Sequence, residues 1–268
     1  MTRSIRAAVS AGDRAFVPFL AAGYPDLAAS EAALWAVAEA GADAVEVGVP
    51  FGDSLADGPV VQGAYHAALA GGTTVARVLE LVSRLKRRGF PPVVLMVAYN
   101  LIHRAGLEEF AARARDAGAD ALLPPDLPVE EWPPLAAALE KAGLDGIRLV
   151  APTTPAARLG RILEAATGFV YYVSQKGVTG ARDHLPAGLA AAVTAVRRQS
   201  DLPVVVGFGI STPEQAATVG RVADGLVVGS ALVRTLDADG RLDRLSALAT
   251  ELRRALRGLG PNPPLDCP

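Results

Sequence analysis

The feature that most constrains the fold of this chain is a regular alternation of short apolar runs with longer helical patterns. Eight runs rich in β-branched and other apolar residues have the length of strands. Several are almost continuously apolar, which is typical of parallel strands buried on both faces. The eight expected strands are residues 16–20, 44–47, 93–97, 121–123, 147–151, 169–174, 204–207 and 225–228. The clearest helical patterns between them are residues 75–88, 107–117, 130–142 and 187–199.

Eight strand–helix units in a chain of 268 residues match the size of a (β/α)8 barrel, or TIM barrel. A doubly wound open sheet has the same element order and is the structural alternative. The composition does not shift along the chain, so we expect one barrel domain over residues 1–258, with extra helices at the N-terminus and in the loops. Residues 259–268 are rich in proline, which predicts a flexible tail.

Composition excludes several classes of protein. With 51% apolar residues the chain can bury a large core, so it is not intrinsically disordered. A net charge of −2, no long basic run and only 5% aromatic residues argue against nucleic acid as a partner. No apolar stretch is long enough to span a membrane, and Pro18 and nearby charges spoil a signal peptide, so we expect a cytoplasmic protein. The single cysteine, Cys267, excludes a disulfide framework.

A glutamate stands inside the second expected strand. In the run Ala44-Val45-Glu46-Val47-Gly48-Val49 the valines share one face, and Glu46 shares the other with two very small residues. Strand alternation therefore points the valines at the helices and Glu46 into the barrel. Burial should raise the pKa of this carboxyl group, which suits an acid that also acts as a base near neutral pH. A structural salt bridge with a neighbouring residue is the alternative.

The loop after this strand, residues 50–59, carries Asp53 and Asp57 among glycines and prolines. Both could be turn residues, or one could reach over the mouth of the barrel to face Glu46. The uneven spacing favours a function, because this strand–helix connection is longer than the others and long loops at this end of a barrel carry chemistry. The three acids have no histidine beside them in the sequence, so we expect no metal site.

Glycines follow the last two expected strands. Gly207 and Gly209 follow the seventh, and Gly229 and Ser230 follow the eighth at the start of a helix. Glycine lets backbone N–H groups approach an anion, and a helix N-terminus adds free donors. The loops after strands seven and eight bind phosphate in many barrels, so we expect phosphate here; simple turn glycines are the alternative. Residues 174–182 form a polar loop with two glycines that is either a mobile lid or an inert surface loop.

These residues resemble the tryptophan synthase alpha subunit family over nearly the whole chain. The resemblance rests on seven segments in the family's order. They are FVPFLAAGYPD from Phe16, ADAVEVGVPFGDSLADGPVVQGA from Ala42, PPDLPVEE from Pro124, APTTP from Ala151, YYVSQKGVTGAR from Tyr171, VVVGFGIS from Val204 and GSALV from Gly229. The fold that the family implies is the barrel expected above.

The resemblance implies a lyase of tryptophan biosynthesis, which reversibly cleaves indole-3-glycerol phosphate to indole and glyceraldehyde 3-phosphate. Glu46 matches the catalytic glutamate that donates and accepts protons. Asp57 matches the loop aspartate that binds the indole N–H, and Tyr171 matches a tyrosine near the glycerol. The family needs no cofactor for this step, because pyridoxal phosphate belongs to the separate beta subunit of an alpha2beta2 heterotetramer. We therefore expect a beta subunit as partner.

The resemblance also places residues around the substrate. Apolar side chains that enclose the indole match Phe19, Leu123 and Phe208. Thr179 matches the lid threonine that packs against the loop aspartate. Backbone groups that hold the phosphate match Gly180, Gly207, Gly209, Gly229 and Ser230.

The sequence departs from the family pattern at four positions. Ser54 stands where a proline is usual, Gln175 and Lys176 change the lid, and Pro124 replaces a small apolar residue. Ser54 and the lid residues lie in the loops that contact the beta subunit. A stand-alone lyase is therefore one alternative. A phosphate-binding barrel isomerase and a weakly catalytic partner of a beta subunit are the others.

Overall fold

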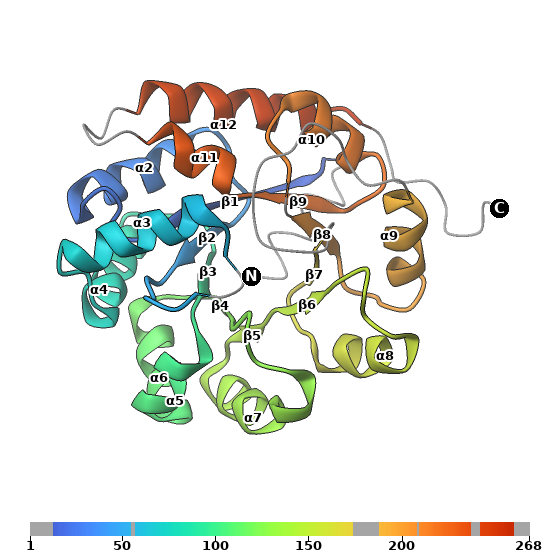
Figure 1. Cartoon of the computed structure of the whole chain (residues 1–268), viewed down its shortest axis with the longest axis horizontal. Coiled ribbons are helices and arrows are strands. Elements are labelled where there is room, and N and C mark those ends of the chain that lie inside the picture. The colour runs from blue at the N-terminus through green and yellow to red at the C-terminus, as the bar shows by residue number, and fades with distance from the viewer. Residues whose placement is uncertain (1–12, 55–56, 174–187, 208, 237–241, 260–268) are drawn as a thin grey trace.

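Nine parallel strands form one sheet in the order β5-β4-β3-β2-β1-β9-β8-β7-β6, with helices around it (Figure 1). The computed structural model describes residues 13–54, 57–173, 188–207, 209–236 and 242–259. The strands are β1 (Ala15–Ala21), β2 (Val45–Gly48), β3 (Val93–Met96), β4 (Ala121–Leu123), β5 (Asp145–Gly146), β6 (Arg148–Val150), β7 (Val170–Val173), β8 (Val204–Gly207) and β9 (Gly225–Val228). The expected extra helix at the N-terminus and residues 260–268, with Cys267, lie outside the described residues.

The barrel closes through one short piece of chain. Strands β5 and β6 stand at the two ends of the sheet order, yet only Ile147 separates them. β5 pairs with β4 and β6 pairs with β7, while the N–H of Ile147 donates to the carbonyl of Leu122 at 2.9 Å. Counted together they are the fifth of eight strands, so the (β/α)8 barrel is confirmed and the open sheet is wrong.

The expected strand 147–151 contains β6, but pairing begins two residues earlier, at Asp145, and changes partner at Ile147. Gly146 explains why the pairing starts so early. A Cβ atom there would lie 2.5 Å from the ring of Trp132, so only glycine lets this strand begin against the indole. The other expected strands agree with the structure to within one or two residues.

Helices pack around the barrel, with extra ones in the loops as the sequence predicts (Figure 1). Helix α4 begins after Thr74, whose hydroxyl accepts from the N–H of Arg77, and ends at Arg87, two residues before Gly89 at φ +78°. The helix expected over 130–142 is divided, because Pro133 starts a new helix. The helices are α2 (Leu27–Glu39), α3 (Pro59–Ala70), α4 (Val75–Arg87), α5 (Tyr99–Ala105), α6 (Leu107–Ala117), η1 (Val129–Glu131), α7 (Pro133–Ala142), α8 (Ala156–Ala165), α9 (Leu189–Arg197), α10 (Pro213–Gly220), α11 (Ser230–Thr235) and α12 (Asp243–Leu256).

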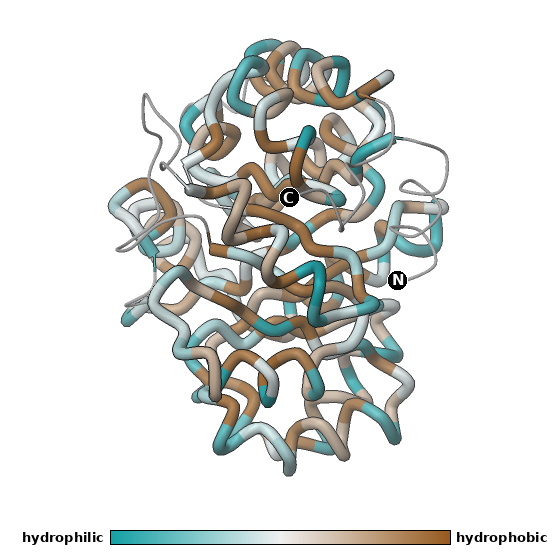
Figure 2. Tube along the Cα trace, turned by 90° about the vertical axis from the view of Figure 1, so that its right-hand side faces the viewer, coloured by the Kyte–Doolittle hydropathy of each residue, from teal (hydrophilic) through white to brown (hydrophobic). Residues whose placement is uncertain are grey.

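Apolar residues concentrate on the strands and polar residues on the outer turns of the helices (Figure 2). Every residue of β1, β2, β8 and β9 is buried, because the strands have the barrel interior on one side and helices on the other. The apolar core continues to Leu259, which packs against Gly220, so the boundary of the expected tail stays a prediction. Among the described helices, none combines the length and the apolar character needed to cross a membrane.

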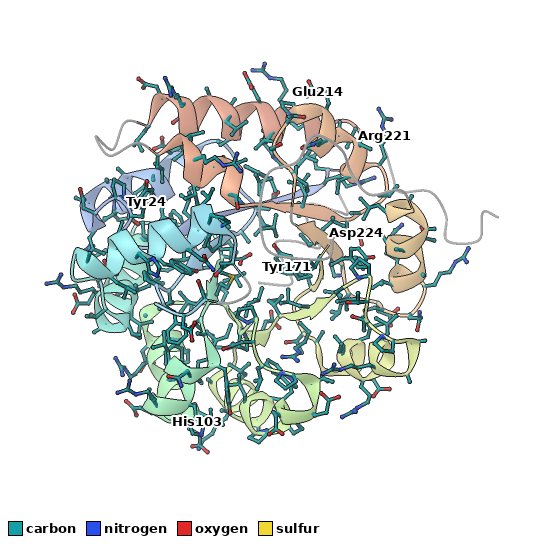
Figure 3. The ribbon with its side chains drawn as sticks, in the orientation of Figure 1. Tyr24, His103, Tyr171, Glu214, Arg221 and Asp224 are labelled. Atoms are coloured by element: carbon teal, nitrogen blue, oxygen red, sulfur yellow. The ribbon has the colours of Figure 1, made fainter. Side chains whose placement is uncertain are left out.

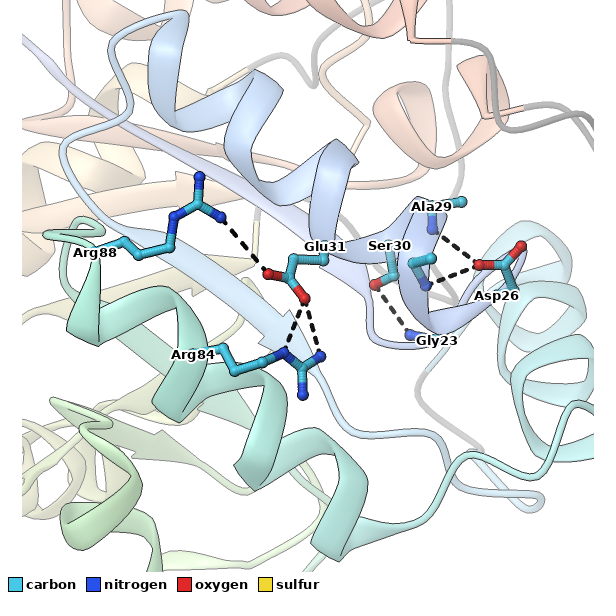
Figure 4. A network of polar contacts seen from close by, with 8 residues as sticks. Gly23, Asp26, Ala29, Ser30, Glu31, Arg84 and Arg88 are labelled. Carbon is cyan, nitrogen blue, oxygen red and sulfur yellow. Dashed lines mark hydrogen bonds and ion pairs between the residues drawn. The ribbon is translucent and has the colours of Figure 1, made fainter.

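Polar contacts fix the first strand–helix connection, as Figure 4 shows. Asp26 caps α2 by accepting from two N–H groups of the first turn at 2.8 and 2.9 Å, and the hydroxyl of Ser30 accepts from the N–H of Gly23 at 3.0 Å. Glu31 of α2 forms an ion pair with Arg84 of α4 at 2.9 Å. The backbone leaving β1 is thereby held beside the mouth of the barrel.

Candidate active site

Glu46 projects from β2 into the barrel, as strand alternation predicts. Its side chain is 1% exposed and lines a cavity at the carboxyl ends of the strands, the barrel cavity. The described residues that line it are Phe19, Glu46, Asp57, Met96, Leu123, Pro125, Leu149, Tyr171, Val227 and Gly229. A parallel barrel carries its active site at this end, so the cavity is the place where this fold supports chemistry.

The carboxyl group of Glu46 has little in the protein to stabilise its charge. Its Oε2 atom is buried and has no hydrogen-bond partner among the described residues, and within that part of the chain no Lys or Arg forms an ion pair with it. Burial raises its pKa to about 8, and the charge of Asp57 adds to the rise. The geometry therefore disfavours a structural salt bridge and makes Glu46 a protonated acid at neutral pH.

Asp57 reaches the same cavity from the loop after β2. It is 5% exposed, and burial raises its pKa to about 6. Ser54 opposes that rise through a side-chain hydrogen bond to the carboxylate, which a proline at this position could not make. The Ser54 carbonyl also accepts from the N–H of Asp57 at 3.2 Å and from Nε2 of Gln62 at 3.0 Å. Asp57 is therefore held in place as an anion beside a neutral Glu46.

Two tyrosines complete the polar part of the site. Tyr171 of β7 lies at the centre of the barrel (Figure 3), and its hydroxyl occupies the space that a side chain on Gly207 would need. Tyr65 of α3, which the sequence analysis missed, lies against Gly48 in the same way. Burial and the two nearby carboxylates raise the pKa of both phenols well above the ordinary value, so both are neutral donors. Each tyrosine fills the space beside a glycine that faces the barrel interior. That contact cannot be seen in the sequence.

Apolar side chains form most of the cavity wall. Phe19 and Leu123 line it, as the family resemblance implies, while Phe208 lies outside the described residues. Sequence reasoning missed Met96, Leu149 and Val227, which stand on three other strands. Each is an ordinary apolar strand residue in the sequence, and only the closed barrel brings it to the cavity. The wall suits a flat apolar group beside the two carboxylates.

The expected phosphate glycines lie at one side of this cavity. Gly207 ends β8, and Gly229 follows β9 with Phe19 packed against it. Gly209 has φ +81°, a conformation that favours glycine, and Ser230 is the first residue of α11. Of these four residues Gly229 lines the barrel cavity, and a phosphate position at this side stays a prediction. Thr179 and Gly180, with Gln175 and Lys176, lie outside the described residues.

The described residues hold no group of three histidine, cysteine or acidic side chains arranged to bind a metal. His103 lies on the outer surface of the barrel in α5 (Figure 3), and His66 of α3 is exposed, with Nε2 3.2 Å from the carbonyl of Gly52. Asp53 is exposed on the rim of the neighbouring cavity that Asp57 and Tyr65 also line. Glu46, Asp53 and Asp57 therefore do not converge on one point, since Asp53 does not line the barrel cavity.

A (β/α)8 barrel with a buried acid, a buried anion and an apolar wall at the carboxyl ends of its strands defines a class: barrel enzymes that use acid–base chemistry on a partly apolar substrate. The comparisons with known proteins identify the family. The chain belongs to the tryptophan synthase alpha chain family, whose model matches residues 5–257.

Known relatives agree with this assignment. The tryptophan synthase alpha chain of Citrifermentans bemidjiense is 52% identical over 223 residues, which are 83% of this chain and 84% of that one. Among solved structures, Mycobacterium tuberculosis tryptophan synthase is 40% identical with a TM-score of 0.89, covering 95% of this chain and 97% of that one. The tryptophan synthase alpha chain of Legionella pneumophila is 33% identical with a TM-score of 0.86 over 95% of each chain.

Proposed function

We propose that this chain catalyses the reversible retro-aldol cleavage of indole-3-glycerol phosphate to indole and glyceraldehyde 3-phosphate, as the alpha subunit of a tryptophan synthase. Membership of the family supports the reaction. The observation that carries the proposal is the shared cavity of Glu46 and Asp57, where one carboxyl group has its pKa raised to about 8 and the other to about 6. Between those values one group holds a proton and the other holds a charge, which is what the reaction requires.

Glu46 moves the protons of the reaction. Cleavage of the bond at indole C3 needs a proton delivered to that carbon, which turns the indole into a cationic indolenine. It also needs a proton removed from the glycerol hydroxyl that becomes the aldehyde. A carboxyl group buried to a pKa of about 8 can give the first proton and then accept the second. The apolar wall keeps water away from the intermediate.

Asp57 stabilises the charge that this protonation creates. A positive charge develops on the indole nitrogen, and a fixed carboxylate in a water-poor cavity lowers the free energy of that state. Ser54 supports the role because its hydrogen bond favours the ionised form of Asp57. Tyr171 lies in the same cavity as a neutral phenol and donates a hydrogen bond to the glycerol portion.

Binding of the substrate divides between the two ends of the cavity. Phe19 and Leu123, with Phe208, enclose the indole, while the N–H groups of Gly207, Gly209, Gly229 and Ser230 hold the phosphate. The roles of Thr179 and Gly180 stay predictions of the resemblance. This chemistry uses protein groups alone, and the pyridoxal phosphate of the family belongs to the beta subunit.

The partner that we propose is a beta subunit in an alpha2beta2 heterotetramer. The chain matches the Mycobacterium tuberculosis tryptophan synthase structure over 95% of its length, which supports a shared mode of assembly. No observation favours the stand-alone lyase, the isomerase or the weakly catalytic partner. A cytoplasmic location stays a prediction of the sequence, in keeping with a family of biosynthetic enzymes.

An assay of indole release tests the proposal. The purified chain is incubated with indole-3-glycerol phosphate without pyridoxal phosphate, first alone and then with a beta subunit. Slow release that the beta subunit strongly accelerates is the expected result. Rapid release that ignores the beta subunit would identify a stand-alone lyase. No indole under either condition would overturn the lyase function and leave a phosphate-binding barrel of another activity.

A further inference from the structure

A second cavity lies beside the barrel cavity, on the outer face of β6. Its volume is about 230 Å³, ample for a small anion with some of its water. The lining comes from the segment after β4, from η1, from β6 and its loop, and from α8. Pro125 and Leu149 line both cavities, so a single layer of side chains separates them. We call it the arginine cavity, after the two charged residues that line it, Arg148 and Arg158.

Arg148 is buried without an acidic partner. Its residue is 5% exposed, and among the described residues no carboxylate forms an ion pair with it. Nη2 donates to the carbonyl of Leu127 at 2.9 Å, and the guanidinium lies 4.1 Å from the centre of the Trp132 ring. The Nε atom is buried and has no hydrogen-bond partner in the described part of the chain.

Burial of an unpaired cation is costly unless something satisfies it. The cost is visible in the pKa of Arg148, which burial and the charge of Arg158 lower to about 10. Contact with the Trp132 ring offsets part of that cost. An anion in the adjoining cavity would offset more, because among the described residues only the charge of Glu130 opposes the lowering of this pKa.

Positive charge exceeds negative charge around the arginine cavity, which favours the binding of an anion. No acidic residue of the described chain lines it. The nearest carboxylate, Glu130, is shared between Arg158 at 2.6 Å and Arg161 at 3.3 Å. Glu130 therefore balances only one of the three arginines gathered here. Thr153 and Thr154 also line the cavity, and hydroxyl groups can donate to an oxyanion.

We propose that the arginine cavity is a binding site for a small oxyanion, the phosphate or carboxylate group of a metabolite, held by Arg148, Arg158 and the hydroxyls of Thr153 and Thr154. Proteins commonly bind phosphate and carboxylate groups with the guanidinium groups of arginine and with hydroxyl donors. The site is separate from the phosphate position proposed above, because the glycines of that position follow β8 and β9. It does not depend on the proposed reaction. Leu149 and Pro125 form the wall that this site shares with the barrel cavity.

Arg158 and Arg161 provide a matched pair of variants. Both form ion pairs with Glu130 on the protein surface, but only Arg158 lines the cavity. Arg158→Gln should weaken anion binding by roughly tenfold, the effect of losing one charge-assisted hydrogen bond. Arg161→Gln should leave binding nearly unchanged. The Arg158 side chain is partly exposed, so its replacement should leave the fold intact. The test therefore needs no substitution of the buried Arg148, which could prevent folding.

The test is a titration of the full chain, labelled with ¹⁵N-arginine, with inorganic phosphate and separately with acetate. The Nε–H signals are assigned with arginine-to-lysine variants. The proposal predicts that at least one anion shifts the signals of Arg148 and Arg158, that Arg158→Gln weakens this titration, and that Arg161→Gln does not. A response to acetate alone identifies a carboxylate site, and a response to phosphate alone identifies a phosphate site.

A Gly209→Asp variant separates this site from the proposed catalytic phosphate position. If the Arg148 and Arg158 signals still titrate in that variant, the arginine cavity binds the anion itself. If they no longer titrate, or if neither anion shifts them in the unchanged chain, the proposal is overturned. Equal weakening by Arg158→Gln and Arg161→Gln would also overturn it, because a general charge effect would then explain the binding. None of these outcomes depends on indole release.

Discussion

At the start of the strands, Asp43 and Asp224 are largely buried beside cations, whereas at the opposite end Glu46 and Asp57 are buried and form no ion pair with any described cation. Asp43 accepts from the N–H of Phe16 at 2.8 Å and lies 3.3 Å from Nη1 of Arg253. Asp224 accepts from the N–H of Val204 at 2.9 Å and lies 3.4 Å from Nε of Arg197. In Figure 3 Asp224 lies farther from the centre of the barrel than Tyr171, which lines the barrel cavity with Glu46 and Asp57.

The comparison separates charges that hold the barrel together from charges that do chemistry. In Asp43 burial raises the pKa, but a hydrogen bond and Arg253 oppose the rise. Glu46, by contrast, has burial and the charge of Asp57 acting in the same direction. Partners at the first end therefore offset part of the cost of burying a charge, whereas at the second end the two acids add to each other's cost, which is typical of a reactive site.

The strongest test of this contrast is Glu46→Gln. We expect cleavage of indole-3-glycerol phosphate to fall by about 10²- to 10⁴-fold, because the proton donor is lost. The thermal midpoint should be unchanged or higher, because an unsatisfied buried carboxyl group is removed. Indole release and thermal unfolding of the same preparation measure both effects. An unchanged rate would remove Glu46 from the mechanism.

Arg253→Met should do the opposite. Loss of this arginine leaves Asp43 buried without its cation, so we expect the free energy of unfolding to fall by about 3 kcal/mol while kcat is retained. The control is Arg84→Met, which breaks the more exposed pair with Glu31 and should cost less than about 1 kcal/mol. Urea unfolding measures both. Equal costs would mean that burial does not distinguish the two pairs.

Asp57→Asn should lower cleavage by about 10²-fold, because the amide cannot balance the charge on the indole nitrogen. Asp53→Asn is the control in the same loop, since Asp53 is exposed and does not line the barrel cavity. Its effect should be less than about threefold, because exposed charges interact weakly with groups elsewhere. Steady-state kinetics of both variants measure these effects. Equal rates of cleavage in Asp57→Asn and Asp53→Asn would mean that Asp57 is only a turn residue.

The smallest effect concerns the phosphate position. Gly209→Asp should raise KM by about tenfold or more through repulsion between the new carboxylate and the phosphate. Because Gly209 has φ +81°, any side chain adds backbone strain, so Gly209→Asn is the matched control with the same shape and no charge. A KM that rises equally in both variants would assign the effect to strain and place the phosphate elsewhere.

Sequence reasoning succeeded where one local rule decides the outcome. Alternation in β2 was enough to place Glu46 inside the barrel, and the helical pattern over residues 75–88 was enough to place α4. It missed the pairing that begins at Asp145, ahead of the expected strand 147–151, where Gly146 lies against the ring of Trp132.

The candidate site also divides into residues that a local rule could place and residues that only the folded structure could place. Asp57 stands in a loop, where no periodicity gives the direction of a side chain, so its place beside Glu46 came from the family resemblance and the structure. Tyr65 was missed because it occupies an ordinary buried position of α3. The bond from Ser54 to Asp57 was not foreseen either, since Ser54 attracted notice only as a departure from the family.

The pH dependence of stability gives the sign of the Glu46 effect. Its folded pKa of about 8 lies above the ordinary value of 4.5, so the native state holds this proton more tightly than the unfolded state. The free energy of unfolding that comes from this group is therefore present at low pH and is lost as the pH rises from about 4.5 toward about 8. Glu46→Gln removes that part of the pH dependence.

The most direct measurement is the titration of Glu46 itself. A ¹³C NMR spectrum of the glutamate carboxyl carbons is followed from pH 4 to pH 10, with the Glu46 signal assigned by its absence in Glu46→Gln. The account predicts a midpoint near 8 for this signal. A midpoint near the ordinary value of 4.5 would contradict it, because Glu46 would then be an anion at neutral pH and could not donate the proton that cleaves the substrate.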